Sequence, residues 1–353
     1  MFTKRLGFFL GPVLFTLIYV IVPAGVISPT AYKVLALAAW VVCWWVSEAV
    51  PFPVTALLPL ILFPLLGVMP INQSAIPYAN PIIFLFMGGF FIALALEKHR
   101  LHERIALNLI RLTGTSGNGI ILGFMLATAF ISMWISNTAT AMMMLPIALS
   151  VVKLIIPNKD EIKEGPSTPE RNFALSLMLV VGYAATLGGL ATIIGTPPNV
   201  VFVGLLSSFN GQKISFGDWM LVGVPVMIAL LVSNYLIVTR ILFPNKIENI
   251  KGSSDLIQHK LQELGKLRKE EKLVLLVFLL TSFLWIFQEA INYWVGSEIL
   301  NDTNVAMAGG LMMFIVPGDL KNLTFLLDWK DTKNMAWGIL ILFGGGLCLA
   351  DGL

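Results

Sequence analysis

Apolar runs long enough to cross a lipid bilayer recur along the whole chain, and they constrain the fold more than any other feature. About 20 residues are enough for a helix to span the hydrocarbon core. Of the 353 residues, 57% are hydrophobic and only 12% are charged, and the mean hydropathy is +0.85. A soluble domain carries about twice that charged fraction. The sequence therefore predicts an all-α polytopic membrane protein.

Two runs of small polar residues interrupt this apolar background. The first extends from Ile131 to Thr140 and contains Ser136-Asn137-Thr138, and the second contains Gly195-Thr196-Pro197-Pro198-Asn199. Small polar residues also serve simply to pack membrane helices closely, and for a single serine that interpretation is preferred. Two runs that combine hydroxyls, amides and helix breakers instead indicate broken helices, which membranes tolerate only where the backbone is buried in protein or lines a wet cavity.

Broken helices supply two kinds of binding group. They expose unpaired carbonyls at one end and unpaired N–H groups at the other. Carbonyls together with Ser, Thr and Asn oxygens replace the water around a hard cation such as Na⁺. Exposed N–H groups at the positive end of a helix favour a carboxylate. The prolines of the second run prevent helix continuation.

The placement of Lys and Arg predicts the topology. With a cytoplasmic N-terminus and a re-entrant hairpin at 118–156, only Lys33 and Lys213 of the 23 basic residues lie outside. If 118–156 crossed the membrane once, the basic loop 244–272 would lie outside, against the positive-inside bias. We therefore expect a multi-pass cell-membrane protein with Ser136-Asn137-Thr138 at the tip of a hairpin.

An internal repeat is also visible. The segment 80–93 resembles 337–350, which pairs Phe86 with Phe343 at an offset of 257 residues, and Val54–Pro64 less clearly resembles Val305–Pro317. In the predicted topology the two copies run in opposite directions, as in many secondary transporters. The offset places a second hairpin tip near position 393, beyond the last residue of this sequence. The sequence thus predicts an inverted-repeat transporter whose second repeat is truncated.

The predicted organisation follows from these spans. It comprises an N-terminal helix (1–30), a first inverted repeat (31–243), a cytoplasmic basic loop (244–272) and the start of a second repeat (273–353). Within the first repeat we expect scaffold spans (32–96), an interfacial arm helix (97–113), the re-entrant hairpin (118–156), a broken helix (173–208) and a span at 219–243.

Other residues with chemical potential favour structural roles. His99 and His102 lie in the amphipathic arm, where Leu101, Ile105, Leu109 and Leu112 recur at helical spacing, and we expect both histidines to be solvated at the surface rather than to bind metal. The two cysteines, Cys43 and Cys348, fall in apolar segments and are expected to be free.

Motifs of soluble enzymes are missing. The sequence contains no GxxxxGK[ST], HExxH or GxSxG pattern, and no basic surface interleaved with aromatic residues that would favour nucleic acid. We expect neither an enzyme nor a nucleic-acid-binding protein.

These motifs resemble those of the divalent anion–sodium symporter family. The resemblance rests on Ser136–Thr140, Ile194–Asn199 and Trp45–Pro53, and it extends over the whole chain. It implies a homodimer that carries di- or tricarboxylates, coupled to Na⁺, by an elevator-like shift of a transport domain. By similarity, Ser132, Ser136, Asn137 and the Gly195 carbonyl would bind Na⁺, and Asn137, Thr138 and Thr196 would touch the substrate carboxylate.

This sequence departs from the family pattern in one respect: it does not contain the second hairpin and the second broken helix. We therefore expect this chain alone not to carry out coupled transport. The alternatives are a carrier of sulfate or another anion from the same family, and a passive anion channel or structural membrane subunit.

Overall fold

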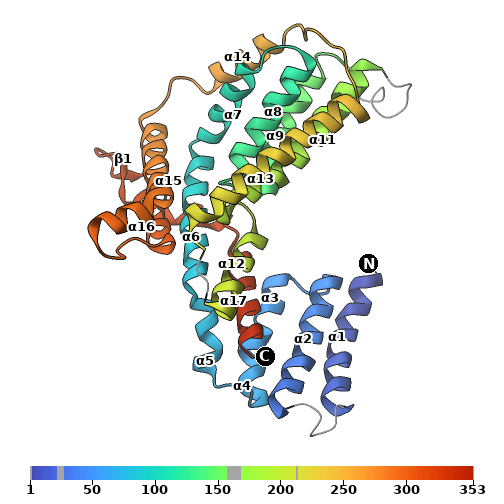
Figure 1. Cartoon of the computed structure of the whole chain (residues 1–353), viewed down its shortest axis with the longest axis vertical. Coiled ribbons are helices and arrows are strands. Elements are labelled where there is room, and N and C mark those ends of the chain that lie inside the picture. The colour runs from blue at the N-terminus through green and yellow to red at the C-terminus, as the bar shows by residue number, and fades with distance from the viewer. Residues whose placement is uncertain (1, 22–27, 157–167, 212–213, 353) are drawn as a thin grey trace. The chain divides into compact units, whose positions relative to one another are not determined.

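The structure, a computed structural model, describes residues 2–21, 28–156, 168–211 and 214–352 (Figure 1). Within this part of the chain, six helices are long and apolar enough to cross a membrane. Strands are confined there to one short antiparallel pair, β1 (Pro317–Asp319) and β2 (Thr324–Phe325). The predicted all-α polytopic fold is confirmed. Lys213 and residues 157–167, which entered the topology prediction, lie outside the described residues.

The chain divides into two compact units. Unit 1 comprises residues 1–87 and 335–353. Its elements are α1 (Phe2–Ile21), α2 (Pro29–Ser47), α3 (Phe52–Ala56), α4 (Leu58–Leu66), α5 (Ile71–Ala75), the 3₁₀ turn η1 (Ile76–Ala79), the first part of α6 (Pro81–Lys98) and α17 (Trp337–Asp351).

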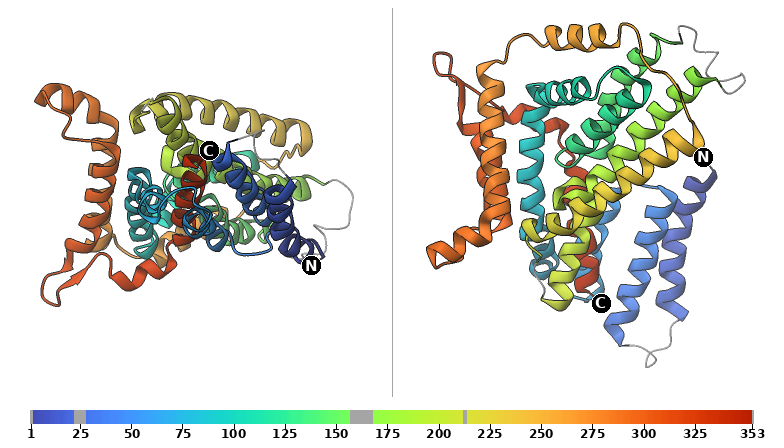
Figure 2. Two further views of the ribbon diagram at one scale, coloured as in Figure 1. Left: turned by 90° about the horizontal axis from the view of Figure 1, so that it is seen from below. Right: turned by 45° about the horizontal axis from the view of Figure 1, so that its top comes forward.

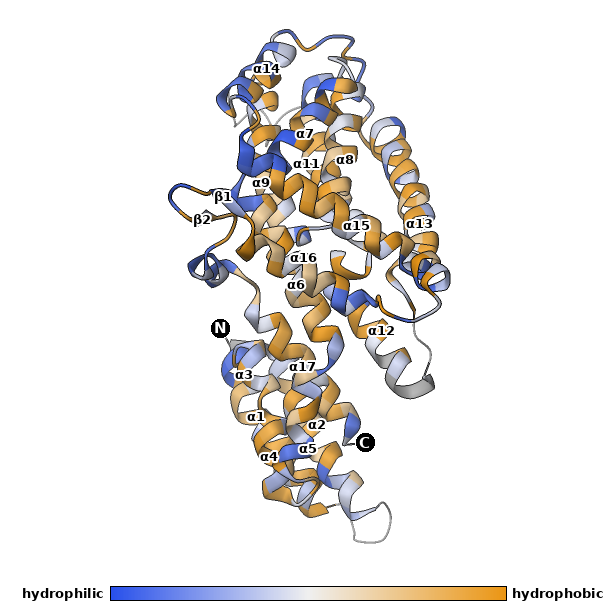
Figure 3. Ribbon diagram, turned by 90° about the vertical axis from the view of Figure 1, so that its left-hand side faces the viewer, coloured by the Kyte–Doolittle hydropathy of each residue, from blue (hydrophilic) through white to orange (hydrophobic). Residues whose placement is uncertain are grey.

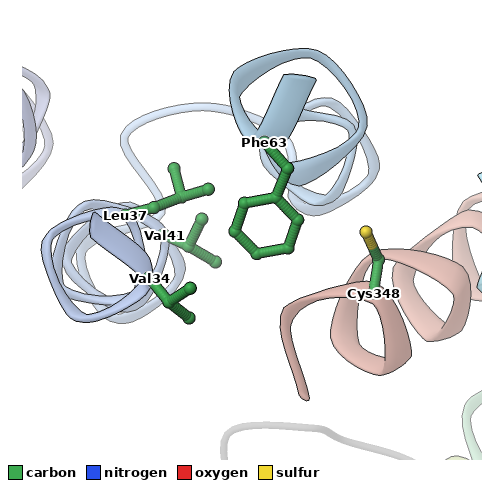
Figure 4. Packing of buried hydrophobic residues seen from close by; sticks show 5 residues of the cluster. All are labelled: Val34, Leu37, Val41, Phe63 and Cys348. Atoms are coloured by element: carbon green, nitrogen blue, oxygen red, sulfur yellow. The ribbon is translucent and has the colours of Figure 1, made fainter. Parts of the chain in front are cut away.

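The core of unit 1 joins segments from both ends of the sequence. Val34, Leu37 and Val41 of α2 surround Phe63 of α4, and Cys348 of α17 completes the cluster (Figure 4). All five side chains are fully buried. Cys348 is thus a small core residue, and both it and the half-buried Cys43 are free thiols, as expected.

Unit 2 comprises residues 88–334 and contains both polar runs. After the end of α6 its helices are α7 (Leu101–Leu112), α8 (Gly117–Ser132), α9 (Asn137–Val152), α11 (Pro169–Gly188), α12 (Pro197–Asn210), α13 (Phe216–Leu236), α14 (Ser253–Glu263), α15 (Lys269–Val295) and α16 (Asp302–Ile315). Short 3₁₀ turns occur at η2 (Gly189–Ala191), η3 (Ile193–Gly195) and η5 (Trp329–Asn334), and a π turn, η4 (Ile237–Leu242), continues α13. Within this unit α8 and α9 both pack against α11 (Figure 2).

The amphipathic helix α7 packs its apolar face against protein. Ala106, Leu107 and Ile110 are at most 2% exposed and face α8 and α14, whereas Leu112 is 78% exposed. Arg104 fixes α7 to α15 through an ion pair between its Nε and Glu271 Oε2 at 2.8 Å. Of the predicted stripe, Leu101 is buried at 2% exposed and Ile105 and Leu109 are half-buried, so the stripe and the buried face overlap only in part. Placement at the membrane surface stays a prediction.

Both histidines of this region are hydrogen-bonded. His102 is only 6% exposed and its Nδ1 lies 2.8 Å from the Leu96 carbonyl oxygen. His99 Nε2 lies 2.9 Å from the Leu326 carbonyl oxygen. The prediction of a solvated surface histidine is wrong for His102, because its turn of the helix faces α8 rather than water.

Two glycine contacts join helices closely, one in each unit. A Cβ on Gly88 of α6 would collide with the backbone of Ala306 in α16. A Cβ on Gly345 of α17 would collide with Ala56 in α3, including its Cα at 2.7 Å. Small residues at such crossings let membrane helices approach closely.

Candidate functional site

The first polar run forms the turn between two helices. Helix α8 ends at Ser132 and α9 begins at Asn137. Ser136 is the N-cap of α9, and its Oγ accepts a hydrogen bond from the Ala139 N–H at 3.3 Å. A serine at this position satisfies a helix N–H that has no partner within the helix. The run therefore ends one helix and starts another.

The second polar run is a break between α11 and α12. Two short 3₁₀ turns, η2 and η3, replace regular helix between Gly188 and Thr196, with Thr192 and Thr196 in extended conformation. Helix α12 resumes at Pro197, where a missing N–H is tolerated because the first helical position has no partner for it. Asn199 holds the break, since its Nδ2 donates to the carbonyls of Gly189 at 2.9 Å and Thr192 at 2.8 Å.

The two runs meet at the side-chain amide of Asn137. One end of this amide faces three oxygens: Ser132 Oγ at 2.8 Å, the Ala185 carbonyl at 3.0 Å and the Gly195 carbonyl at 3.2 Å. The single Ser132 hydroxyl hydrogen is donated to the Ala185 carbonyl at 2.5 Å, so Ser132 accepts from Asn137. The amide nitrogen is therefore assigned to this end, where it donates to all three groups.

Glycines allow this convergence. A Cβ on Gly188 would collide with the Ala129 backbone of α8, and a Cβ on Gly189 would collide with the side-chain amide of Asn137, whose Cγ would lie 3.1 Å away. A Cβ on Gly195 would lie 2.6 Å from the Gly189 carbonyl oxygen. The break can therefore lie against the turn only because these positions carry no side chain.

Three further contacts fix the turn in place. The buried Thr192 hydroxyl donates to the Met133 carbonyl at 2.5 Å, which ties the break to the turn. Trp134, in the turn itself, stacks on Phe216 of α13 with ring centroids 6.2 Å apart, and meets Phe278 of α15 edge to face at 4.8 Å. The turn is thus held from three neighbouring elements.

The predicted site residues divide into two groups. Ser132, Asn137 and Gly195 lie together through the contacts above. Ser136 and Thr138 are exposed and Thr196 is half-buried, and no hydrogen bond joins Thr138 to Thr196 among the described residues. Thr196 makes no side-chain capping bond at the start of α12.

Sequence reasoning missed three residues of this arrangement. Thr192, Asn199 and Trp134 lie inside the quoted runs, but the runs were interpreted as ligand groups. Thr192 is 0% exposed and Asn199 is 6% exposed, and both satisfy backbone carbonyls. The helix break itself is the sequence signal for such residues, because backbone carbonyls that lose their helical partners need other hydrogen-bond donors.

Comparison with known proteins gives the family. Residues 4–353 match the family described as "Sodium:sulfate symporter transmembrane region". The chain belongs to this family. It is 44% identical over 354 aligned residues to a protein named sodium-dependent dicarboxylate transporter SdcS from Staphylococcus saprophyticus, and 40% identical to one of that name from Staphylococcus aureus. Each alignment covers 99% of this chain and 67% of the relative.

Family membership decides the protein class. A member of a symporter family is a multi-pass membrane transporter and not an enzyme, and the family's coupling ion is Na⁺. The groups gathered at Asn137 fit that ion, because Na⁺ is bound by neutral oxygens of carbonyls, hydroxyls and amides. Among the described residues, no group of three or more His, Cys, Asp or Glu side chains could hold a metal ion.

Proposed function

We propose that the protein is a Na⁺-coupled symporter of dicarboxylates such as succinate. The observation that carries this proposal is the convergence of Ser132 Oγ and the Ala185 and Gly195 carbonyls on Asn137. The names of the two staphylococcal relatives support a dicarboxylate rather than sulfate as the substrate.

In the proposed Na⁺ site, the Asn137 amide nitrogen stands in for the cation. It is a positively polarised group that faces three oxygens from three separate elements, α8, α11 and η3. When Na⁺ enters, a half rotation of the amide turns Oδ1 towards the ion. Oδ1 then binds Na⁺ together with the same three oxygens. Ser136, next to Asn137 in the chain, contributes a further oxygen.

The proposed substrate groups are Asn137, Thr138 and Thr196. Thr138 lies in the first turn of α9 and Thr196 is the N-cap of α12. The N-terminal turn of a helix favours an anion through its unpaired N–H groups and its dipole. Two such helix ends with a threonine hydroxyl each supply donors for one carboxylate of the substrate. The two ends are linked by the Thr192–Met133 and Asn137–Gly195 contacts.

We propose that transport follows an elevator-type motion and that the site described here is one half of a two-part site. Helices α8, α9 and α11 pack together and carry Ser132, Asn137 and Ala185, while Gly195 lies in the break that follows α11; this packing suits movement as one body. The inverted repeat is supported by the two glycine contacts. Gly88 corresponds to Gly345 at the 257-residue offset, and their partners Ala306 and Ala56 lie in the second pair of similar segments.

We also propose that the protein forms a homodimer, that it lies in the cell membrane, and that its N-terminus is cytoplasmic. The last is supported by the basic residues of the loop 244–272, which the positive-inside bias favours on the cytoplasmic side. Cross-linking in vesicles and labelling of single cysteines introduced near Lys4 and near Lys246 test the dimer and the orientation.

The direct test is uptake of labelled succinate into proteoliposomes that contain the protein from its complete reading frame. We expect saturable uptake that needs inward-directed Na⁺ and is inhibited by unlabelled dicarboxylates more strongly than by sulfate. Stronger inhibition by sulfate would indicate that the protein is a sulfate carrier instead. Linear flux without Na⁺ dependence would assign a passive channel. Na⁺-dependent uptake by these 353 residues alone would contradict the two-part site.

A further inference from the structure

A second polar feature lies in unit 2, between the start of α13 and the last turns of α15. A cavity of about 440 Å³ opens there. One end is polar, with Ser215 and Asp218 from α13 and Gln288 and Glu289 from α15. The wall is apolar and includes Leu221, Val224, Pro225 and Ile286. We name this cavity the α13–α15 groove.

Negative charge gathers at the polar end of the groove. Asp302, which precedes the apolar part of α16, lies behind Gln288 and accepts a hydrogen bond from its Nε2 at 2.6 Å. Burial is the main cause that raises the pKa of Asp302 to about 6, and the negative charges of Asp218 and Glu289 contribute to that rise. Among the described residues, no Lys or Arg side chain forms an ion pair with any of these three carboxylates.

Gln288 provides an independent indication of a ligand. Its side chain is only 5% exposed, and its Oε1 has no hydrogen-bond donor among the described residues. The orientation of the amide is fixed, because the nitrogen must face the Asp302 carboxylate. A buried carbonyl oxygen without a donor is rare in native structures. The Ser215 hydroxyl already donates to Asp218 Oδ2 at 2.7 Å, and Trp285 Nε1 donates to the Asp302 carbonyl at 3.0 Å. The side-chain groups left for a ligand are therefore acceptors, namely two carboxylates and one amide oxygen.

The apolar wall indicates the rest of the ligand. Both walls belong to helices that are candidate membrane spans, Phe216–Leu242 and Lys269–Val295. Hydrophobic residues dominate both helices (Figure 3), and Leu221 of the wall is 76% exposed. The polar residues lie near the ends of both helices, which in a bilayer would put them at the level of the lipid headgroups, with the apolar wall extending towards the hydrocarbon.

We propose that the α13–α15 groove binds a lipid whose headgroup carries a primary amine. The ammonium group donates hydrogen bonds to Gln288 Oε1 and to the carboxylates of Glu289 and Asp218. The acyl chain lies along Leu221, Val224 and Pro225. A primary ammonium fits better than a bare ion, because the volume of the groove far exceeds that of an ion and most of its wall is apolar.

The groove is close to the transport machinery. Trp285, which lines it, stacks on Phe216 with ring centroids 4.5 Å apart, and Phe216 in turn stacks on Trp134 in the turn between α8 and α9. An amine lipid seated here would therefore hold α13 and α15 together next to the proposed site. The proposal concerns lipid binding only and stands whether or not the transported anion is a dicarboxylate.

The test is lipid retention by the complete protein, measured by native mass spectrometry after transfer from vesicles of equal parts phosphatidylethanolamine and phosphatidylglycerol. We expect retained phosphatidylethanolamine to exceed phosphatidylglycerol by about tenfold, the ratio associated with one charge-assisted hydrogen bond. In a second set of vesicles, phosphatidylcholine replaces phosphatidylethanolamine. Its retention should exceed that of phosphatidylglycerol by less, because the phosphatidylcholine cation has no N–H donor.

The variant Glu289→Gln removes one charge from the groove and should lower the preference severalfold. Glu298→Gln makes the same chemical change at an exposed residue outside the groove and should leave the preference unchanged. Equal retention of both lipids by the wild type, or equal effects of the two variants, would overturn the proposal. Displacement by free ethanolamine at millimolar concentration would assign the site to a soluble amine and would also overturn it.

Discussion

The turn between α8 and α9 and the break between α11 and α12 use similar residues for different purposes. The turn leaves Ser136 and Thr138 exposed and offers a hydroxyl and an amide at the start of a helix. The break buries Thr192 and Asn199 and uses them to satisfy carbonyls that a continuous helix would have paired internally. Polar residues in an apolar segment can thus bind a ligand or hold irregular backbone. Burial and hydrogen-bond partners separate the two roles.

If this comparison is right, substitutions in the turn change transport, whereas substitutions in the break change stability. The largest expected effect is that of Asn137→Ala. It removes the group that meets Ser132, Ala185 and Gly195, and with it the proposed Na⁺ ligand. Loss of one such ligand, at about 1.5–3 kcal/mol, lowers uptake at fixed Na⁺ by roughly 10- to 100-fold.

Uptake of labelled succinate by Asn137→Ala is compared with uptake by Asn108→Ala. Asn108 is an exposed asparagine of α7 whose amide bonds only within its own helix. The thermal midpoint of the Asn137 variant should also fall, because the Ala185 and Gly195 carbonyls lose a donor, so uptake is compared per amount of folded protein in the vesicles. Equal uptake by the two variants would remove Asn137 from the site.

The next effect is that of Asn199→Leu in the break. The substitution removes both donors to the Gly189 and Thr192 carbonyls and leaves these buried oxygens unpaired. A buried group left without its partner costs about 1–3 kcal/mol. We expect a clear fall in the thermal midpoint of the detergent-solubilised protein. A stable Asn199→Leu protein with a selective loss of Na⁺ dependence would place Asn199 among the ligands instead.

A smaller loss of stability is expected for Thr192→Val. The side chains have similar shapes, so the change removes chiefly the hydrogen bond to the Met133 carbonyl. The expected cost is about 1 kcal/mol. Thr192→Ser retains the hydroxyl and serves as the matched control. If the valine variant unfolds at the same temperature as the serine variant, the link between the break and the turn contributes nothing measurable.

The smallest effect is that of Thr138→Ala. Its exposed hydroxyl contributes one of several donors to the substrate carboxylate, and a single neutral hydrogen bond contributes about 1 kcal/mol. The KM for succinate should rise by about fivefold with an unchanged Na⁺ dependence. Thr138→Ser should recover most of the affinity. A changed Na⁺ dependence would instead assign Thr138 to the ion site.

Much of the fold could be predicted because its signals are local. Apolar runs of membrane length and helix breakers at 136–138 and 195–198 locate the helices and their interruptions. The grouping of Ser132, Asn137 and Gly195 was anticipated from the resemblance rather than from the spacing of the residues. The burial of His102 was not anticipated, since helical periodicity shows an apolar face but not whether lipid or protein covers it.

The roles of Thr192 and Asn199 could not be obtained from sequence for a related reason. Their side chains contact carbonyls of Met133 and Gly189, and such a contact depends on how the broken segment folds back. The residue types alone fit a ligand and a backbone donor equally well. The two carboxylates of the α13–α15 groove, Asp218 and Glu289, come from two helices and lie far apart in the chain, so that no motif indicates them.

The most direct test of the central claim is the Na⁺ dependence of succinate uptake by wild type and Asn137→Ala in the same proteoliposomes. The account predicts that the wild type is half-activated at a defined Na⁺ concentration and that the variant needs at least about tenfold more Na⁺. An Asn137→Ala protein with the wild-type Na⁺ dependence and the wild-type rate would contradict the proposal that the turn and the break meet to bind the coupling ion.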